Sequence, residues 1–101
     1  MPKLRDYDSY LINSLKDPTE ASLYLSAAFE DDDPRVAAIA LDHVLRARNH
    51  TVTRIAEKAH LNREHLYRIL AGKVEPEFRT LKVLCAIAGF SLTVQDQQPI
   101  H

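Results

Sequence analysis

Residues 62–68 gather side chains that could recognise a nucleic acid. Each carries a charge or a hydrogen-bonding group: Asn62, Arg63, Glu64, His65, Tyr67 and Arg68. An arginine can bond both acceptors on the edge of a guanine, and a histidine or tyrosine can reach a base or a phosphate. We therefore predict that this stretch contacts DNA.

Further basic residues flank this stretch and could contact the DNA backbone. Phosphate contacts add salt-dependent affinity without reading the sequence, and they need only a positive charge at the right place. Arg54, Lys58, Lys73 and Arg79 meet that need. The predicted DNA-binding set is Arg54, Lys58, Asn62, Arg63, Glu64, His65, Tyr67, Arg68 and Lys73.

Several of these residues also have simpler interpretations. Glu64 and Arg68 stand four residues apart and could form only an ion pair within a helix. Tyr67 could instead close the edge of the core. His60 fits a turn, because histidine tolerates a left-handed backbone better than most residues. His60 and His65 lack a third ligand at metal spacing, so we predict no metal site.

Two short helices must position these side chains. The spacing predicts a helix through Ile55, a tight turn at His60–Leu61, and a second helix over Arg63–Leu70 that Asn62 caps and Gly72 ends. Apolar residues on one side of the second helix would pack on the first: Leu66, Ile69 and Leu70 on Ile55, Ala56 and Ala59. Such a helix-turn-helix presents its second helix to the major groove of DNA.

Other helices are expected on both sides of this pair. Helices are predicted at Tyr7–Leu15, at Pro18–Phe29 after a capping Asp17, and at Pro34–Arg48 after a capping Asp33. Thr51 or Thr53 caps the next helix, and Pro76 and Glu77 open the last one, which Gly89 ends. The residues predicted to face the core include Val36, Ile39 and Phe78.

Residues Phe90–Val94 alternate apolar and polar side chains, which is typical of a strand. A lone strand cannot satisfy its backbone groups, so it either lies irregularly or pairs with its copy in a second subunit. The sequence thus predicts an all-α domain of five to six helices over residues 1–94 with one short C-terminal strand. Its parts are acidic helices at 1–48, a helix-turn-helix at 51–72, a last helix and strand at 76–94, and a flexible tail at 95–101.

Charge is unevenly distributed along the chain. Residues 1–42 carry four basic and nine acidic side chains, whereas residues 43–82 carry nine basic and four acidic ones. Opposite charges suggest two partner surfaces, although both could be simply solvated helix faces. The acidic run Glu30–Asp33 is explained by helix starts, where negative charge is stabilised.

Composition argues against several classes of protein. No apolar run reaches the ~18 residues of a membrane span, and no secretion signal is evident. The single Cys85 excludes an internal disulfide and favours a reduced, cytoplasmic setting. Cys85 itself lies on an apolar helix face, and no catalytic grouping shares a local motif, so we expect neither an enzyme nor a cofactor.

The chain as a whole resembles the addiction-module antidote family, the antitoxins of bacterial toxin–antitoxin pairs with a lambda-repressor-like helix-turn-helix. The resemblance covers about residues 4–94. The segments that carry it are Leu4–Asp8, Tyr10–Leu11, Leu15–Pro18, Glu20–Ala21, Tyr24–Leu25, Ala27–Ala28, Asp32–Pro34, Ala37–Leu41, Ile55–Lys58, Leu61–Arg68, Thr80–Leu84 and Gly89–Phe90. Three positions depart from the family pattern: His60 replaces the usual turn glycine, Asn62 a serine cap, and His65 a small hydroxyl residue.

The resemblance implies a repressor-like domain, a homodimer and two partners. One partner is a small basic toxin of the RelE/ParE type, which the antitoxin silences. The other is double-stranded operator DNA, through which the protein represses its own transcription. A plain transcriptional regulator without a toxin partner is the alternative, and a helical adaptor without DNA binding is a third possibility.

Overall fold

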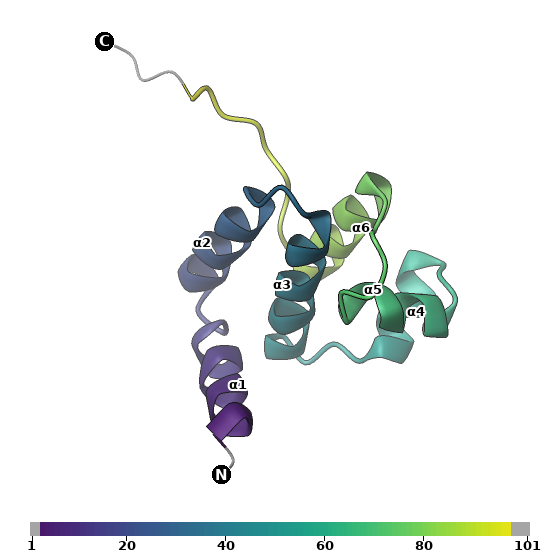
Figure 1. Cartoon of the computed structure of the whole chain (residues 1–101), viewed down its shortest axis with the longest axis horizontal. Helices are drawn as coiled ribbons and strands as arrows, with labels where there is room; N and C mark the ends of the chain where they lie inside the picture. The colour runs from purple at the N-terminus through teal and green to yellow at the C-terminus, as the bar shows by residue number, and fades with distance from the viewer. Residues whose placement is uncertain (1–2, 98–101) are drawn as a thin grey trace.

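Six helices make up the fold of residues 3–97 (Figure 1). The computed structural model describes the backbone of residues 3–97 and the side chains of residues 8–97. The helices are α1 (Lys3–Ser14), α2 (Pro18–Phe29), α3 (Pro34–Ala47), α4 (Val52–Ala59), α5 (Arg63–Leu70) and α6 (Phe78–Ala88). The predicted all-helical class is confirmed for these residues, and none of their helices has the length and apolar character needed to span a membrane.

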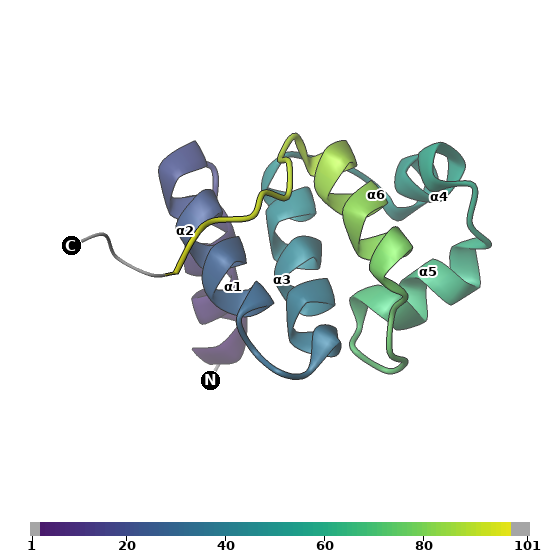
Figure 2. The ribbon, with the colours of Figure 1, turned by 90° about the horizontal axis from the view of Figure 1, so that it is seen from above.

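Helix α3 lies at the centre of the molecule. It packs against α1 and α2 on one side and against α5 and α6 on the other, and α4 packs against α5 and α6 (Figure 2). Helices α1 and α2 and the α4–α5 pair are therefore separated by a shared central helix.

Local sequence decides where most helices begin. A side-chain oxygen at each start accepts a backbone N–H of the first turn, which would otherwise lack a partner. The pairs are Asp17 with Thr19 at 3.0 Å, Asp33 with Arg35 at 3.0 Å, Thr51 with Arg54 at 3.2 Å and Asn62 with Glu64 at 2.8 Å. Thr51 rather than Thr53 is thus the cap of α4. Helix α6 begins at Phe78, later than predicted, and Glu77 caps it without a side-chain bond.

The core is built around α3. Leu41 and Val44 are completely buried, and four alanines of α3 let its neighbours approach closely. The prediction that Val36 and Ile39 are buried is wrong, since they remain 36% and 37% exposed. The face of α3 that packs against the neighbouring helices is instead the one that carries its buried alanines.

Phe78 is also more exposed than predicted. It remains 66% exposed because it is the first residue of α6, at the rim of the core. The Nζ atom of Lys82 lies 5.9 Å from the centre of its ring. The ring of Phe78 therefore lies beside the Lys82 cation and not in the core, where the helical spacing predicted it.

The strand predicted at Phe90–Val94 is not formed in this single chain. Residues 90–97 have no regular secondary structure, and no strand lies beside them among residues 3–97. The segment leaves α6 at Gly89 and passes over α3 and α2 (Figure 2). Its first side chain, Phe90, is held by the guanidinium of Arg48, 4.7 Å from the ring centre. Pairing with a second copy stays a prediction.

Candidate nucleic-acid interface

The turn between α4 and α5 is closed by backbone bonds. The N–H of Leu61 donates to the carbonyl of Ala56 at 3.0 Å, and the N–H of His60 donates to that of Glu57 at 3.3 Å. These bonds require a left-handed residue after the helix, and His60 takes that conformation with φ 57° and ψ 44°. The prediction that His60 serves the turn is confirmed.

Asn62 then sets the direction of α5. Its Oδ1 atom accepts the N–H groups of Glu64 at 2.8 Å and His65 at 3.1 Å. The opposite side of α5 is anchored in the core by Leu66, Ile69 and Leu70, as predicted. A capped start and a buried face together fix which side chains of α5 point to solvent.

All nine residues of the predicted DNA-binding set are exposed: Arg54, Lys58, Asn62, Arg63, Glu64, His65, Tyr67, Arg68 and Lys73. Tyr67 is 66% exposed and therefore does not close the core. Arg68 lies 3.5 Å from Glu64, so the predicted intrahelical ion pair is present. An exposed pair of this length stabilises little, and Arg68 remains available to a ligand.

Two adjoining hollows give this surface its shape. One, of about 580 Å³, is lined by Val52, Asn62, Arg63, Glu64 and Tyr67. The other, of about 510 Å³, lies where α3, α4 and α5 meet, and its lining includes Arg46, His50, Thr51, Val52 and Tyr67. Because Val52 and Tyr67 line both hollows, the concave surface continues from the start of α5 to the end of α3.

Arg46 and His50 were absent from the predicted set. Arg46 is held by Asp42 at 2.7 Å, and this hydrogen bond raises the pKa of the guanidinium. His50 is partly buried, which lowers its pKa. The spacing of Asp42 and Arg46 indicates an ion pair on α3, but only the packing of α3 on α5 brings that pair beside Tyr67.

Comparison with known proteins identifies the family. Residues 4–96 match the family described as probable addiction module antidote protein. The chain belongs to this family. It is also 35% identical over 96 residues to an uncharacterized protein of Haemophilus influenzae, with 95% of this chain and 93% of that protein covered. No solved structure matches the chain.

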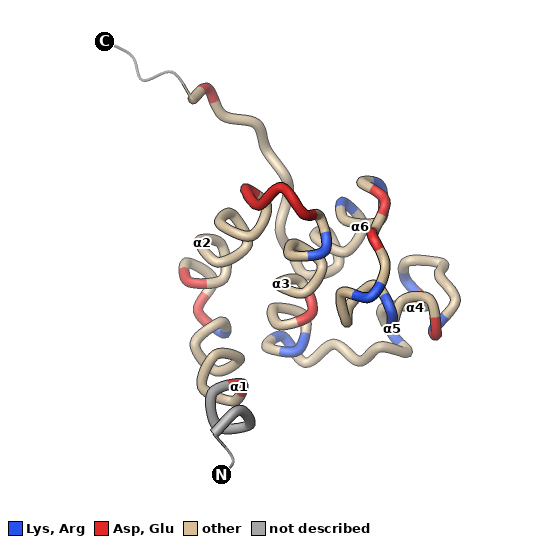
Figure 3. Tube along the Cα trace, in the orientation of Figure 1, with Lys and Arg blue, Asp and Glu red and all other residues tan. Residues whose placement is uncertain are grey.

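In this antidote-family chain acidic and basic residues are unevenly distributed over the fold. The loop between α2 and α3 is acidic, and basic residues gather at the end of α3 and along α4 and α5 (Figure 3). Asp33 is engaged locally, since it caps α3 and pairs with Arg35 at 2.9 Å. Asp31 accepts the N–H of Asp33 at 2.9 Å, and Glu30, Asp31 and Asp32 are all exposed.

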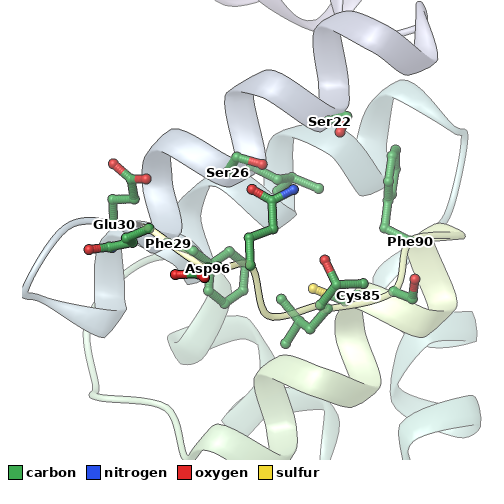
Figure 4. Close-up of a pocket in the computed structure, with 13 residues that line it drawn as sticks. Ser22, Ser26, Phe29, Glu30, Cys85, Phe90 and Asp96 are labelled. Atoms are coloured by element: carbon green, nitrogen blue, oxygen red, sulfur yellow. The ribbon is translucent and has the colours of Figure 1, made fainter. Parts of the chain in front are cut away.

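A third hollow lies away from the α4–α5 pair. It measures about 480 Å³ and separates α2 from the C-terminal segment, with Ser22, Ser26 and Phe29 on one side (Figure 4). Cys85 is buried at its base, and burial raises the pKa of the thiol to about 11. The thiol is therefore protonated near neutral pH and is a poor nucleophile.

Proposed function

We propose that this antidote-family chain is an antitoxin that neutralises a basic toxin of the RelE/ParE type and binds its own operator to repress transcription of the pair. Membership of the antidote family over residues 4–96 is the observation that carries the toxin-binding part. The DNA-binding part is supported by the exposed, concave and basic surface of the α4–α5 pair.

In this proposal α4 and α5 form a lambda-repressor-like helix-turn-helix. Helix α5 enters the major groove, where Arg63 and Arg68 bond base edges, while Arg54, Lys58 and Lys73 contact phosphates. The protein acts as a homodimer, which places two copies of α5 about 34 Å apart on successive turns of a palindromic operator.

The toxin is proposed to bind on the acidic side of the fold. Glu30 and Asp32 are exposed in the α2–α3 loop, and Glu20 is exposed on α2. Leu23 of α2 is 63% exposed and offers an apolar contact one helical turn from Glu20. Complementary charge would speed the association with a basic toxin and orient it. Because α3 lies between this side and α4–α5, the two partners need not compete for one surface.

The DNA-binding part is tested with the segment upstream of the protein's own gene. Replacing Arg63 or Arg68 with Ala should weaken binding by about 1–3 kcal/mol if each arginine reads a base. Arg35→Ala is the matched control, because Arg35 is an exposed arginine at the start of α3. Equal affinity of all three variants and the wild type would exclude base reading by α5.

The toxin-binding part is tested by coexpression with the neighbouring gene. The proposal expects that gene to arrest growth when expressed alone and this protein to restore growth. Asp32→Lys should weaken the rescue, whereas Glu77→Lys, an equal charge change before α6, should not. A toxic neighbour that this protein fails to relieve would refute the antitoxin role and leave the plain regulator.

A further inference from the structure

The corner where α3 ends and α4 begins concentrates positive charge. Arg48 is the C-terminal cap of α3, and His50 lies in the loop that connects α3 to α4. Arg54 and Lys58 lie one helical turn apart on α4. Neither Arg54 nor Lys58 forms an ion pair with any residue between 8 and 97. We call His50, Arg54 and Lys58 the basic corner. The charge of Arg48 also acts on His50, but its guanidinium is engaged with the ring of Phe90.

His50 occupies the centre of the basic corner. Its backbone N–H donates to the carbonyl of Leu45 at 3.0 Å, which fixes the loop, and its partly buried side chain lines the hollow beside Tyr67. Burial lowers the pKa of His50, and the charges of Lys58, Arg54 and Arg48 lower it further. The ring is therefore neutral at pH 7, and the site repels a further proton.

The remaining charged and titratable groups at the hollow do not relieve this repulsion. Asp42 and Arg46 of α3 line the same hollow but neutralise each other at 2.7 Å. From α5 the hollow receives Tyr67, whose side chain carries no carboxylate. The start of α4 adds further positive character, because the N-terminus of a helix favours anions.

We propose that the basic corner binds a backbone phosphate of duplex DNA and that His50 takes up a proton when the phosphate arrives. This inference rests on the proposed DNA-binding function. The hollow at His50 shares Val52 and Tyr67 with the hollow at the start of α5, so a strand contacted by α5 can continue to the corner. A phosphate there offsets the repulsion among the cations and favours the charged imidazole. DNA affinity consequently increases as the pH falls.

The test uses fluorescence anisotropy with a labelled duplex of arbitrary sequence and about 25 base pairs, since phosphate contacts need no operator. The affinity of the wild type should increase about threefold to tenfold between about pH 7.5 and pH 6, because a pKa rise of one unit on binding gives at most about tenfold. His50→Gln should abolish most of this gain. His50→Lys should bind tightly across the whole range.

His43→Gln is the matched control. His43 is likewise partly buried, but it lies on the α2 side of α3, where it is bonded to Tyr24 at 2.7 Å, so its variant should keep the pH dependence of DNA binding. The slope of log affinity against log salt concentration reports the number of phosphates that the protein neutralises. At pH 6 this number should be smaller by about one in His50→Gln than in the wild type. Far-UV circular dichroism at each pH shows that every variant is folded.

Two failures of this experiment have different meanings. If the wild type binds no DNA at any pH and low salt, the proposed DNA-binding function is wrong, and the inference about His50 is wrong with it. If the wild type binds but its affinity does not depend on pH, or His50→Gln keeps the full dependence, only the role of His50 is overturned.

Discussion

Replacing His60 with glycine should stabilise the protein. His60 holds the left-handed conformation that ends α4, with φ 57° and ψ 44°, and its side chain is exposed. For an L-residue this conformation costs roughly 1–2 kcal/mol, because Cβ approaches the following carbonyl oxygen. Glycine avoids that cost but loses roughly 0.5–1 kcal/mol more conformational entropy on folding. The midpoints of these two ranges give a gain of about 0.75 kcal/mol in the free energy of unfolding.

The measurement is urea unfolding followed by circular dichroism, together with a thermal melt. For a domain of this size the expected gain raises the Tm by about 2–5 °C. His60→Ala removes the imidazole but keeps Cβ, so it should bring no gain. Asn49→Gly is a second comparison, because Asn49 has φ 63° but asparagine tolerates that region well.

Equal stabilisation by His60→Ala and His60→Gly would contradict this prediction. The imidazole, and not the backbone conformation, would then be the source of the strain. A loss of stability in His60→Gly would show that the side chain makes a favourable contact that outweighs the backbone cost.

Three further predictions concern the same fold. Asn62→Ala should lower the free energy of unfolding by about 1 kcal/mol because it removes the cap of α5. Asn62→Asp should retain most of the stability that the cap contributes, and urea unfolding measures both variants. Burial lowers the pKa of His43 in the folded protein below its usual 6.5. As the pH drops below about 6.5, His43 therefore binds a proton more readily in the unfolded chain, and the free energy of unfolding should fall. The decline should be smaller in His43→Gln, and an unchanged decline would contradict the assignment. Gly72→Ala should destabilise by about 1–2 kcal/mol, since φ is 74° and the new Cβ would lie 2.6 Å from Cδ1 of Ile39. Combining Gly72→Ala with Ile39→Ala should recover only the part of the lost stability that is due to the clash with Ile39.

Features that depend on neighbouring residues could be predicted from the sequence. Asp17, Asp33 and Asn62 each begin a helix where expected, because a cap bonds N–H groups only two or three residues away. The outward face of α5 follows for the same reason, since helical spacing determines which side carries Leu66 and Ile69.

Features that depend on distant packing could not be predicted. The spacing of Val36 and Ile39 indicates a helix but does not say which of its faces the other helices cover. Tyr24 and His43, bonded at 2.7 Å, stand nineteen residues apart in the sequence, and only the packing of α2 on α3 joins them. His50 enters the candidate site in the same way, because the hollow beside it needs α3, α4 and α5 together.

Helices α4 and α5 contain only eight residues each, and this limits how small a working fragment of the protein can be. Isolated helices shorter than about 12–15 residues are marginal in water, so a synthetic peptide spanning the pair would be largely unfolded. The pair is held by its packing on α3 and α6, and the smallest piece that keeps its outer surface must include both. A single proteolytic cut within α3 should therefore destabilise that surface, even though the cut leaves every exposed residue of α4 and α5 intact.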